Sequence, residues 1–331
     1  MTVRFGLLGA GRIGKVHAKA VSGDAHARLV AVADAFPAAA QAIADSYGCE
    51  VRTIEAIEAA DDIDAVVICT PTDTHADLIE RFARAGKAIF CEKPIDLDVG
   101  RVRDCLKTVA ATGGKLMVGF NRRFDPHFMA VRQAIDDGRI GDVEMVTIIS
   151  RDPGAPPVDY IKRSGGIFRD MTIHDFDMAR FLLGEEPTIV TAHAAVLVDP
   201  EIGTAGDYDS VSVILETATG KQAIISNSRR ATYGYDQRIE VHGSKGVVSA
   251  ENQRAVSIEI ANGEGYTRPP LHDFFMTRYT QAYANEIASF ISAIETGTEI
   301  APSGADGLAA LALAEAALRS VKEKRQVAVE V

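Results

Sequence analysis

Apolar residues in the first 120 positions follow two alternating patterns. Short, continuous apolar runs, typical of strands buried on both faces, predict strands at 3–8, 29–33, 65–69, 87–91 and 115–119. Between them, apolar residues three or four positions apart predict helices at 12–22, 37–47, 74–85 and 98–111. Strands that alternate with helices in this way predict an α/β fold with a doubly wound parallel sheet of the Rossmann type.

Beyond residue 120 the pattern changes to a helix followed by closely spaced strands separated by glycine turns. The helix is predicted at 126–137, and the strands at 143–151, 189–198, 210–217, 221–228, 236–242, 246–250 and 254–260. Two helical runs at 278–295 and 303–323 and a last strand at 326–331 complete the chain. We therefore predict a Rossmann domain over 1–120 and a second α/β domain over 121–331 with a large, open, mostly antiparallel sheet. The C-terminal helix either stays with that sheet or packs back on the first domain.

A glycine-rich turn lies between the first predicted strand and the first predicted helix. It reads Gly9-Ala10-Gly11-Arg12-Ile13-Gly14, and the second strand ends at Asp34. The first two glycines allow a tight turn and close approach to a pyrophosphate, the third lets helix and strand pack, and the phosphates sit at the helix N-terminus. A carboxylate at Asp34 would accept a hydrogen bond from a ribose 2′-hydroxyl and repel a 2′-phosphate. The turn therefore predicts a dinucleotide site that favours NAD over NADP.

Two further motifs follow strands of the same predicted sheet. Cys69-Thr70-Pro71-Thr72-Asp73-Thr74-His75 follows one strand, and Glu92-Lys93-Pro94 ends another. Ligands of open α/β sheets bind outside the carboxyl ends of the strands. Because a proline disfavours helical backbone before it, Lys93 is expected to leave the sheet and point toward the nicotinamide side of the site.

The run from Ser164 to Asp177 places a carboxylate and an imidazole four residues apart. Asp170 and His174 would lie one above the other on a helical face, and Asp177 would extend the row. Gly165 and Gly166 remove side chains where a ligand or another backbone segment could come close. An imidazole that titrates near neutral pH beside a carboxylate can act as a proton acceptor.

Charge and cysteine usage narrow the class of protein. A net charge of −11 argues against a nucleic-acid or anionic-membrane surface, and no apolar run approaches the length of a membrane span. The first strand begins almost at Met1, which leaves no room for a signal peptide. The four cysteines form no CxxC pair, so we expect reduced thiols and no metal site. These features predict a cytoplasmic enzyme.

Together the motifs resemble those of the Gfo/Idh/MocA oxidoreductase family along essentially the whole chain. The resemblance is carried by the glycine turn, Thr70-Pro71 with His75, Glu92-Lys93-Pro94, and Gly165-Gly166 with Asp170 and His174. It implies a second domain whose open sheet carries subunit contacts, and commonly a homotetramer. A narrower likeness, to members that oxidise myo-inositol to 2-keto-myo-inositol, is carried by segments 119–125, 150–153 and 164–183.

The resemblance also implies roles for individual residues. His174 would be the base, Asp170 would orient a substrate hydroxyl, and Lys93 would donate to the reacting oxygen while its charge keeps His174 neutral. Implied cofactor contacts are Gly9, Gly11, Arg12, Ile13, Gly14, Asp34, Thr70, Pro71, His75, Glu92 and Lys93. Implied substrate contacts besides the catalytic three are Arg123, Asp152, Tyr160, Asp177 and Tyr233. Tyr235 competes with Tyr233 for that role, and an interdomain salt bridge is the alternative role for Arg123.

Other functions remain open at this point. Neighbouring members of the family oxidise other polyols or sugars, such as scyllo- or chiro-inositol or an aldose. Some relatives have lost catalysis and act as sugar-responsive regulators, and another branch uses NAD transiently to cleave glycosides. The intact set of Lys93, Asp170 and His174 argues against a regulator, because a binding module does not need all three.

Overall fold

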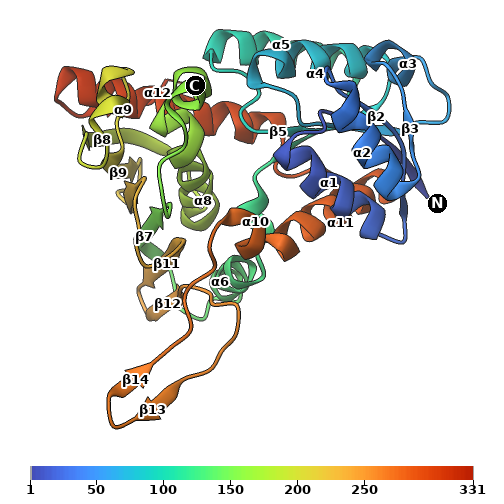
Figure 1. Ribbon diagram of the computed structural model, residues 1–331. Coiled ribbons are helices and arrows are strands. Elements are labelled where there is room, and N and C mark those ends of the chain that lie inside the picture. Colours follow the sequence, from blue (N-terminus) through green and yellow to red (C-terminus); the bar gives the residue numbers. More distant parts are fainter. Residues whose placement is uncertain (1, 331) are drawn as a thin grey trace. The chain divides into compact units, whose positions relative to one another are not determined.

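The chain forms two compact units, which the computed structural model describes for residues 2–330 (Figure 1). The first unit comprises residues up to 124 and residues 281–311, and the second comprises residues 125–280 and 312–330. The first unit is therefore built from two separate stretches of chain.

The first unit contains a parallel sheet with the strand order β3-β2-β1-β4-β5-β6. Its strands are β1 (Val3–Leu8), β2 (Ala27–Ala33), β3 (Glu50–Val51), β4 (Ala65–Ile68), β5 (Ala88–Glu92) and β6 (Leu116–Gly119). From β1 the chain adds β2 and β3 toward one edge of the sheet and then β4, β5 and β6 toward the other. The point where this order reverses, between β1 and β4, is where ligands bind in Rossmann folds. The predicted doubly wound sheet is confirmed, and its edge strand β3 is an addition to the prediction.

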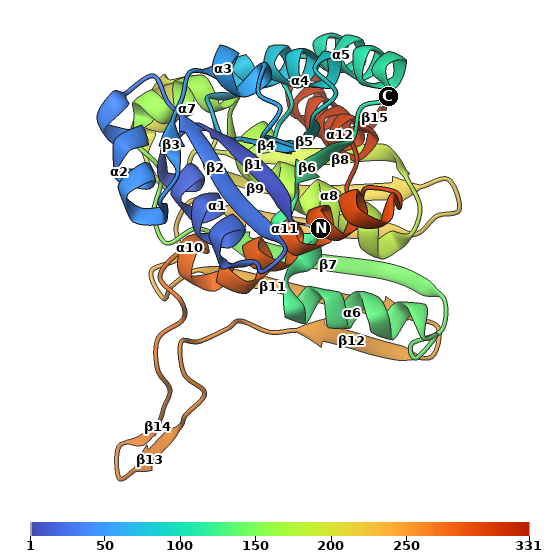
Figure 2. The ribbon, with the colours of Figure 1, turned by 90° about the vertical axis from the view of Figure 1, so that its right-hand side faces the viewer.

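Helices cover both faces of this sheet. They are α1 (Arg12–Gly23), α2 (Pro37–Tyr47), α3 (Ile54–Glu58), α4 (His75–Arg84), α5 (Val99–Thr112) and α11 (Thr280–Thr296). Figures 1 and 2 show α4 and α5 on one face and α1, α2 and α11 on the other. On the α11 face, the Phe290 ring lies 6.2 Å from that of Phe5 and 6.0 Å from that of Phe90. This aromatic cluster anchors α11, from a distant part of the chain, to the core of the first unit.

The second unit is built on a sheet with the strand order β12-β11-β7-β10-β9-β8-β15. Its strands are β7 (Val143–Arg151), β8 (Pro187–Ala195), β9 (Ser210–Thr217), β10 (Gln222–Ser228), β11 (Asp236–Gly243), β12 (Gly246–Ala250) and β15 (Val327–Ala328). The β7–β10 pair is parallel and the neighbouring pairs are antiparallel, as predicted. Buried and exposed residues alternate along β9 and β10, which is typical of a sheet covered on one face.

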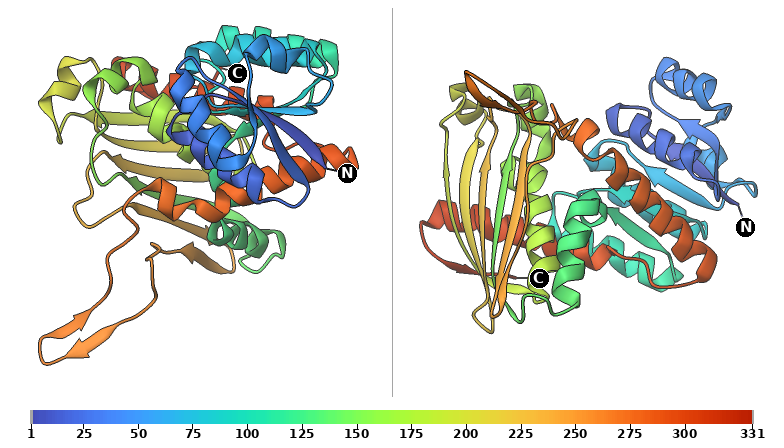
Figure 3. Two further views of the ribbon diagram at one scale, coloured as in Figure 1. Left: turned by 45° about the vertical axis from the view of Figure 1, so that its right-hand side comes forward. Right: turned by 90° about the horizontal axis from the view of Figure 1, so that it is seen from below.

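Six α-helices among the described residues accompany this sheet. They are α6 (Pro126–Asp136), α7 (Val158–Ser164), α8 (Ile173–Leu183), α9 (Pro200–Thr204) and α10 (Phe275–Arg278), with α12 (Gly304–Glu323) running from the first unit into the second. Of these, α6 and α8 pack against its strands. In the right-hand view of Figure 3, α8 (yellow-green) runs along the strands, on the same side of the sheet as α6 (green). Helix α8, which packs on β7 and β10, carries the predicted His174.

The prediction of a strand at 254–260 is wrong. Arg254 makes only an isolated bridge with Leu271, and the chain then forms a separate hairpin of β13 (Ile260–Asn262) and β14 (Gly265–Thr267). Figure 2 shows this hairpin at the end of an extended arm that leaves the second unit next to β12. The apolar residues of the segment belong to the exposed arm, where Ile258 and Ile260 are 56% and 54% exposed. Within residues 2–330, no helix has the length and apolar character needed to cross a membrane.

Candidate active-site residues

The glycine turn is shaped by the packing of the first unit and by open space beside it. Gly9 has a φ of +98°, and a Cβ there would lie 2.6 Å from the carbonyl group of Cys69. A Cβ on Gly14 would lie 2.0 Å from the carbonyl oxygen of Gly9. At Gly11, in contrast, a Cβ would meet no described atom within 4 Å. Gly9 and Gly14 are therefore required by the fold, whereas Gly11 leaves room at the N-terminus of α1 for a phosphate.

Asp34 is tied directly to this turn. The backbone N–H of Ala10 donates to Oδ2 of Asp34 at 2.6 Å, and the N–H of Phe36 donates to Oδ1 at 2.7 Å. These bonds hold the carboxylate beside the glycine turn while leaving lone pairs on both oxygens for a ribose hydroxyl. The residues present thus fit a dinucleotide with a free 2′-hydroxyl.

His75 links the two other motifs of the first unit. Its ring is 2% exposed, with Nδ1 2.8 Å from the carbonyl oxygen of Pro94 and Nε2 2.8 Å from that of Thr70. The short helix η1 (Thr72–Thr74) begins directly after Pro71. The hydroxyl of its last residue, Thr74, lies 2.6 Å from the Thr70 hydroxyl. The imidazole therefore braces the loops after β4 and β5 against each other.

Glu92 and Lys93 diverge at the end of β5. Glu92 is the last residue of the strand, and its Oε1 lies 2.7 Å from Nε2 of His17 in the core. Lys93 follows outside the strand and is partly exposed, as predicted. The Glu92 carboxylate thus links the end of β5 to α1 through its hydrogen bond with His17, a partner that the motif spacing did not indicate.

In the second unit, Asp170 is surrounded by hydrogen-bond donors. The Tyr160 hydroxyl donates to its Oδ1 at 2.9 Å, and Nη1 and Nη2 of Arg229 donate to its Oδ2 at 3.4 and 3.3 Å. Arg229 is 1% exposed, and its Nη2 also lies 3.8 Å from Oδ2 of Asp207. Tyr160 and Asp170, which were nominated separately, are therefore brought together. Sequence reasoning missed Arg229 and Asp207, which stand far from the motif in the chain.

The segment that carries Asp170 is not a regular α-helix. Residues 168–172 form a π-helical turn, and α8 begins at Ile173. The wider turn changes the stacking of Asp170 on His174 that a regular helix would give, and π-turns are frequent at functional sites. His174 lies in the first turn of α8 and is partly exposed.

The structure gives a reason for the two glycines that was not predicted. Gly165 and Gly166 have φ values of +84° and +83°, a left-handed conformation that L side chains rarely adopt. A Cβ on Gly166 would lie 2.7 Å from Oδ1 of Asp207, which accepts the N–H of Ile167 at 3.0 Å. It is thus an aspartate side chain that comes close here. Burial, above all, raises the pKa of the Asp207 carboxyl above its usual range.

The remaining aspartates of α8 are buried. Asp177 is 0% exposed, and its Oδ1 lies 3.6 Å from Nη1 of Arg180. Asp175, also 0% exposed, accepts hydrogen bonds from the Ser150 hydroxyl at 2.6 Å and the Asn227 amide at 2.8 Å. The contacts of Asp175 fix α8 on β7 and β10, whereas the Asp177–Arg180 pair lies within α8 itself.

The structure separates the two candidate tyrosines. Tyr235 is 5% exposed, and its ring lies 5.9 Å from Phe274 and 6.0 Å from Tyr279. Tyr233 is 51% exposed, accepts from Arg151 at 3.0 Å and donates to Asp236 at 2.5 Å. Tyr235 therefore packs in the core, and Tyr233 is the tyrosine that a ligand can reach.

Two other nominated residues sit near strand or helix ends. Arg123, in η2 (Asn121–Phe124), donates to Asp306 of α12 at 2.9 Å. Because both residues belong to the first unit, this ion pair does not join the two units. Asp152 follows β7, and its N–H donates to the Ser228 carbonyl at 2.9 Å.

Family models match both units of the chain. The model for an oxidoreductase family with an NAD-binding Rossmann fold matches residues 3–120, and the model for the GFO/IDH/MocA C-terminal domain matches residues 128–249. The chain belongs to the Gfo/Idh/MocA family.

Relatives of this Gfo/Idh/MocA protein match it from end to end. It is 86% identical to inositol 2-dehydrogenase of Rhizobium meliloti strain 1021, over 99% of this chain and 100% of the relative. The structure of a myo-inositol dehydrogenase from Corynebacterium glutamicum has a TM-score of 0.96 and 44% identity, and each chain covers 100% of the other. A scyllo-inositol dehydrogenase from Lactobacillus casei, solved with NAD(H) and scyllo-inositol, has a TM-score of 0.92 and 31% identity over 99% of both chains.

These findings establish an NAD-dependent oxidoreductase, and the chemistry of the glycine turn agrees.

The cysteines of this family member are suited to packing and not to reaction. All four are free thiols in residues 2–330, and burial raises the pKa of Cys69 and Cys91 well above the usual value and that of Cys105 to about 12.

Proposed function

We propose that this protein is an inositol 2-dehydrogenase, which oxidises myo-inositol to 2-keto-myo-inositol (scyllo-inosose) and reduces NAD. The observation that carries the proposal is the hydrogen bonding of Asp170, which lies four residues before His174 in the chain. Its carboxylate is held by the Tyr160 hydroxyl and by the buried guanidinium of Arg229. Such a group accepts hydrogen bonds from a substrate that offers hydroxyls and no charge. The names of the relatives support the choice of an inositol.

The proposed chemistry assigns one task to each residue. When bound, NAD supplies the hydride acceptor. His174 accepts the hydroxyl proton as the hydride leaves, because an alcohol is too weak an acid to ionise unaided at neutral pH. Asp170 orients the reacting carbon through a neighbouring hydroxyl, and Lys93 stabilises negative charge that develops on the oxygen.

Selectivity among cyclitols would come from further polar groups that pair with ring hydroxyls. Proposed contacts are Tyr160, which shares Asp170, and Tyr233, together with Arg123, Asp152 and Asp177. Discrimination is strong where a missing hydroxyl leaves a buried polar group without a partner. The buried Asp177 pairs with Arg180 one turn further along the same helix, which supports an indirect contribution of that carboxylate through the local structure of α8.

We also propose that the enzyme is a homotetramer and works in the cytoplasm on a small-molecule substrate, without nucleic-acid or membrane partners and without a metal. Supporting the assembly is the uncovered face of the second sheet, where Met145, Ile214, Ile224 and Val247 are 38–56% exposed. Apolar surface of this kind is typical of protein–protein contacts. Sedimentation at several protein concentrations tests the oligomeric state.

The deciding experiment measures NADH formation with myo-inositol, scyllo-inositol, D-chiro-inositol, D-glucose and D-xylose, each with NAD and with NADP. The highest kcat/KM with myo-inositol and NAD is expected, and a His174→Ala preparation gives the background from contaminating dehydrogenases. Activity confined to another polyol would replace the substrate and leave the mechanism. No activity across the panel, with NAD still binding, would favour a regulator or the branch that cleaves glycosides.

A further inference from the structure

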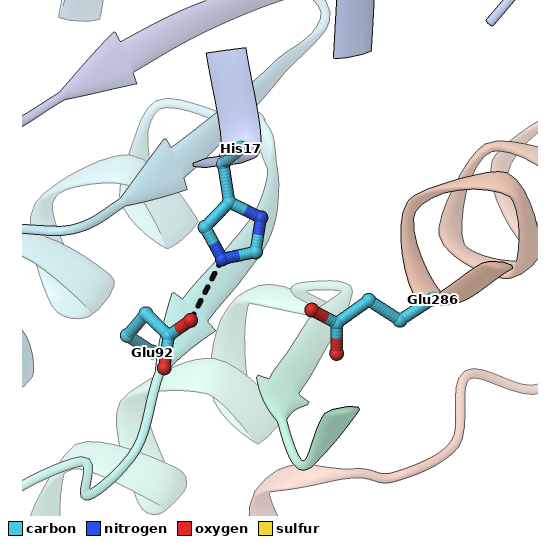
Figure 4. Close-up of side chains that lie close together, drawn as sticks. All are labelled: His17, Glu92 and Glu286. Carbon is cyan, nitrogen blue, oxygen red and sulfur yellow. Dashed lines mark hydrogen bonds and ion pairs between the residues drawn. The ribbon is translucent and has the colours of Figure 1, made fainter. Parts of the chain in front are cut away.

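Three titratable side chains from separate elements meet in the core of the first unit. His17 lies on α1, Glu92 at the end of β5 and Glu286 on α11, and they are 0%, 9% and 0% exposed. One ligand atom from each lies within 4.8 Å of the other two. Figure 4 shows the Glu286 carboxylate pointing toward the pair formed by His17 and Glu92.

The pair is bonded, whereas Glu286 brings polar atoms without a protein partner. His17 Nε2 lies 2.7 Å from Glu92 Oε1, and the ring packs 4.9 Å from Phe90 and 5.6 Å from Tyr283. Neither carboxylate oxygen of Glu286 has a hydrogen-bond partner among the described residues, and the same holds for His17 Nδ1. Two ionised carboxylates so close together and so far from water repel each other, so the second must be neutralised by a proton or a cation.

The geometry favours the proton. Ligands at about 2.0–2.2 Å around a tetrahedral ion lie roughly 3.3 Å apart, so a metal held by both members of the pair would break their short hydrogen bond. Burial, together with the charge of Glu92, raises the pKa of the Glu286 carboxyl well above its usual value. Burial, together with the charge of Glu92, also raises the pKa of Cys69, so its thiol stays neutral.

The proposed catalytic lysine, Lys93, directly follows Glu92 of this cluster in the chain. Phe90 and Glu92 point to the same face of β5, toward α1 and α11, and Lys93 is the next residue. On the neighbouring strand, a Cβ on Gly119 would come within 3.2 Å of the Glu92 carboxyl group. Glu92 is thus held from β6 and α1, and Glu286 approaches from α11.

We propose that Glu286 is a positioning residue for the dehydrogenase reaction. It stays protonated, its hydroxyl donates a hydrogen bond to a bridging water, and this water in turn donates to the Glu92 carboxylate of the His17–Glu92 pair. This bridge keeps the end of β5 in one conformation and thereby fixes where the Lys93 side chain starts. The proposal rests on the proposed role of Lys93 for its effect on turnover, but the protonation state of Glu286 does not depend on that role.

The first test is infrared difference spectroscopy at neutral pH on the full-length protein. We expect the carbonyl band of a buried carboxylic acid in the wild type, its loss in Glu286→Gln, and its retention in Glu295→Gln, a matched change at a partly exposed carboxylate on the same helix. Absence of the band in the wild type would overturn the proposal. A stoichiometric divalent metal that Glu286→Gln loses would overturn it equally.

Kinetics then test positioning. Glu286→Gln stays neutral and keeps a donor, so kcat should change less than about twofold, whereas Glu286→Leu should lose about tenfold in kcat with unchanged affinity for NAD. A fall in the Gln variant equal to that in the Leu variant would refute donation by the acid, and full turnover in a folded Leu variant would refute positioning. Should the Leu variant not fold, the Gln variant decides, since a tenfold loss there contradicts the proposal. Should the wild type oxidise no polyol, the proposed function fails, while the infrared test of protonation stands.

Discussion

Exchange of Asp34 tests how the first unit distinguishes NAD from NADP. We consider the double variant Asp34→Ser with Ala35→Arg, which removes the carboxylate and adds a guanidinium at an exposed neighbouring position. The single variant Asp34→Asn keeps the shape and an oxygen acceptor but removes the charge. The exposed Asp45 of α2 supplies a matched control as Asp45→Asn.

The size of the effect follows from the contacts of the carboxylate. Two unit charges about 4 Å apart repel by about 1 kcal/mol in water and about 4 kcal/mol near a protein surface. Asp34 is only partly buried, so about 2 kcal/mol is a reasonable cost for a 2′-phosphate. A guanidinium that pairs with the phosphate contributes about 1.5–3 kcal/mol. Together these terms predict a shift of about 300- to 4,000-fold in relative kcat/KM for the double variant and about 30-fold for Asp34→Asn.

The readout is the ratio of kcat/KM for NAD to that for NADP, measured with one saturating polyol. The ratio is required because Asp34→Ser also removes the acceptor of the Ala10 N–H, which is almost fully buried, and so weakens both cofactors. Asp45→Asn should leave the ratio unchanged. If both Asp34 variants kept the wild-type ratio, the carboxylate would not select the cofactor, and the reasoning from its place beside the glycine turn would be wrong.

Three further changes probe the second unit and the core. His174→Ala should lower kcat by about 10²- to 10⁴-fold at unchanged NAD affinity, the loss expected on removing a general base, and full activity would place the base elsewhere. Tyr160→Phe removes one hydrogen bond to Asp170 and should lower kcat/KM about three- to tenfold. Tyr266→Phe, on the exposed arm, should leave kcat/KM unchanged. Equal kcat/KM values for the two variants would show that Tyr160 does not contribute to substrate binding or turnover. Phe290→Ala should destabilise the fold by about 3–5 kcal/mol in denaturant titrations because the ring is fully buried, and a loss below about 1 kcal/mol would contradict its place in the core.

Local patterns in the sequence were sufficient to predict the first sheet. The runs that became β1, β4 and β5 are buried on both faces, so each is a continuous apolar stretch that periodicity detects. The close contact at Gly14 was also predictable, because a strand, a glycine turn and a helix in succession place Gly14 against the carbonyl oxygen of Gly9. β3 escaped because it has only two exposed residues and no periodic pattern.

Features that depend on distant parts of the chain could not be predicted. The partners of Asp170 include Arg229, 59 residues away, and nothing local to either residue indicates the pairing. Apolar residues at 254–260 predicted a strand of the large sheet, because a pattern reports apolar character but not where the segment lies. The π-helical turn was missed because regular helix spacing was assumed throughout the Ser164–Asp177 motif.

The return of residues 281–311 to the first unit has a consequence for how the protein is made. A ribosome releases the glycine turn and its sheet long before α11, so the face of the sheet that α11 covers stays uncovered while the whole second unit is synthesised. A gene fragment ending near residue 124 would encode the dinucleotide motif yet leave Phe5 and Phe90 without Phe290. The core that supports the dinucleotide motif is therefore completed late, when nearly the entire chain has left the ribosome.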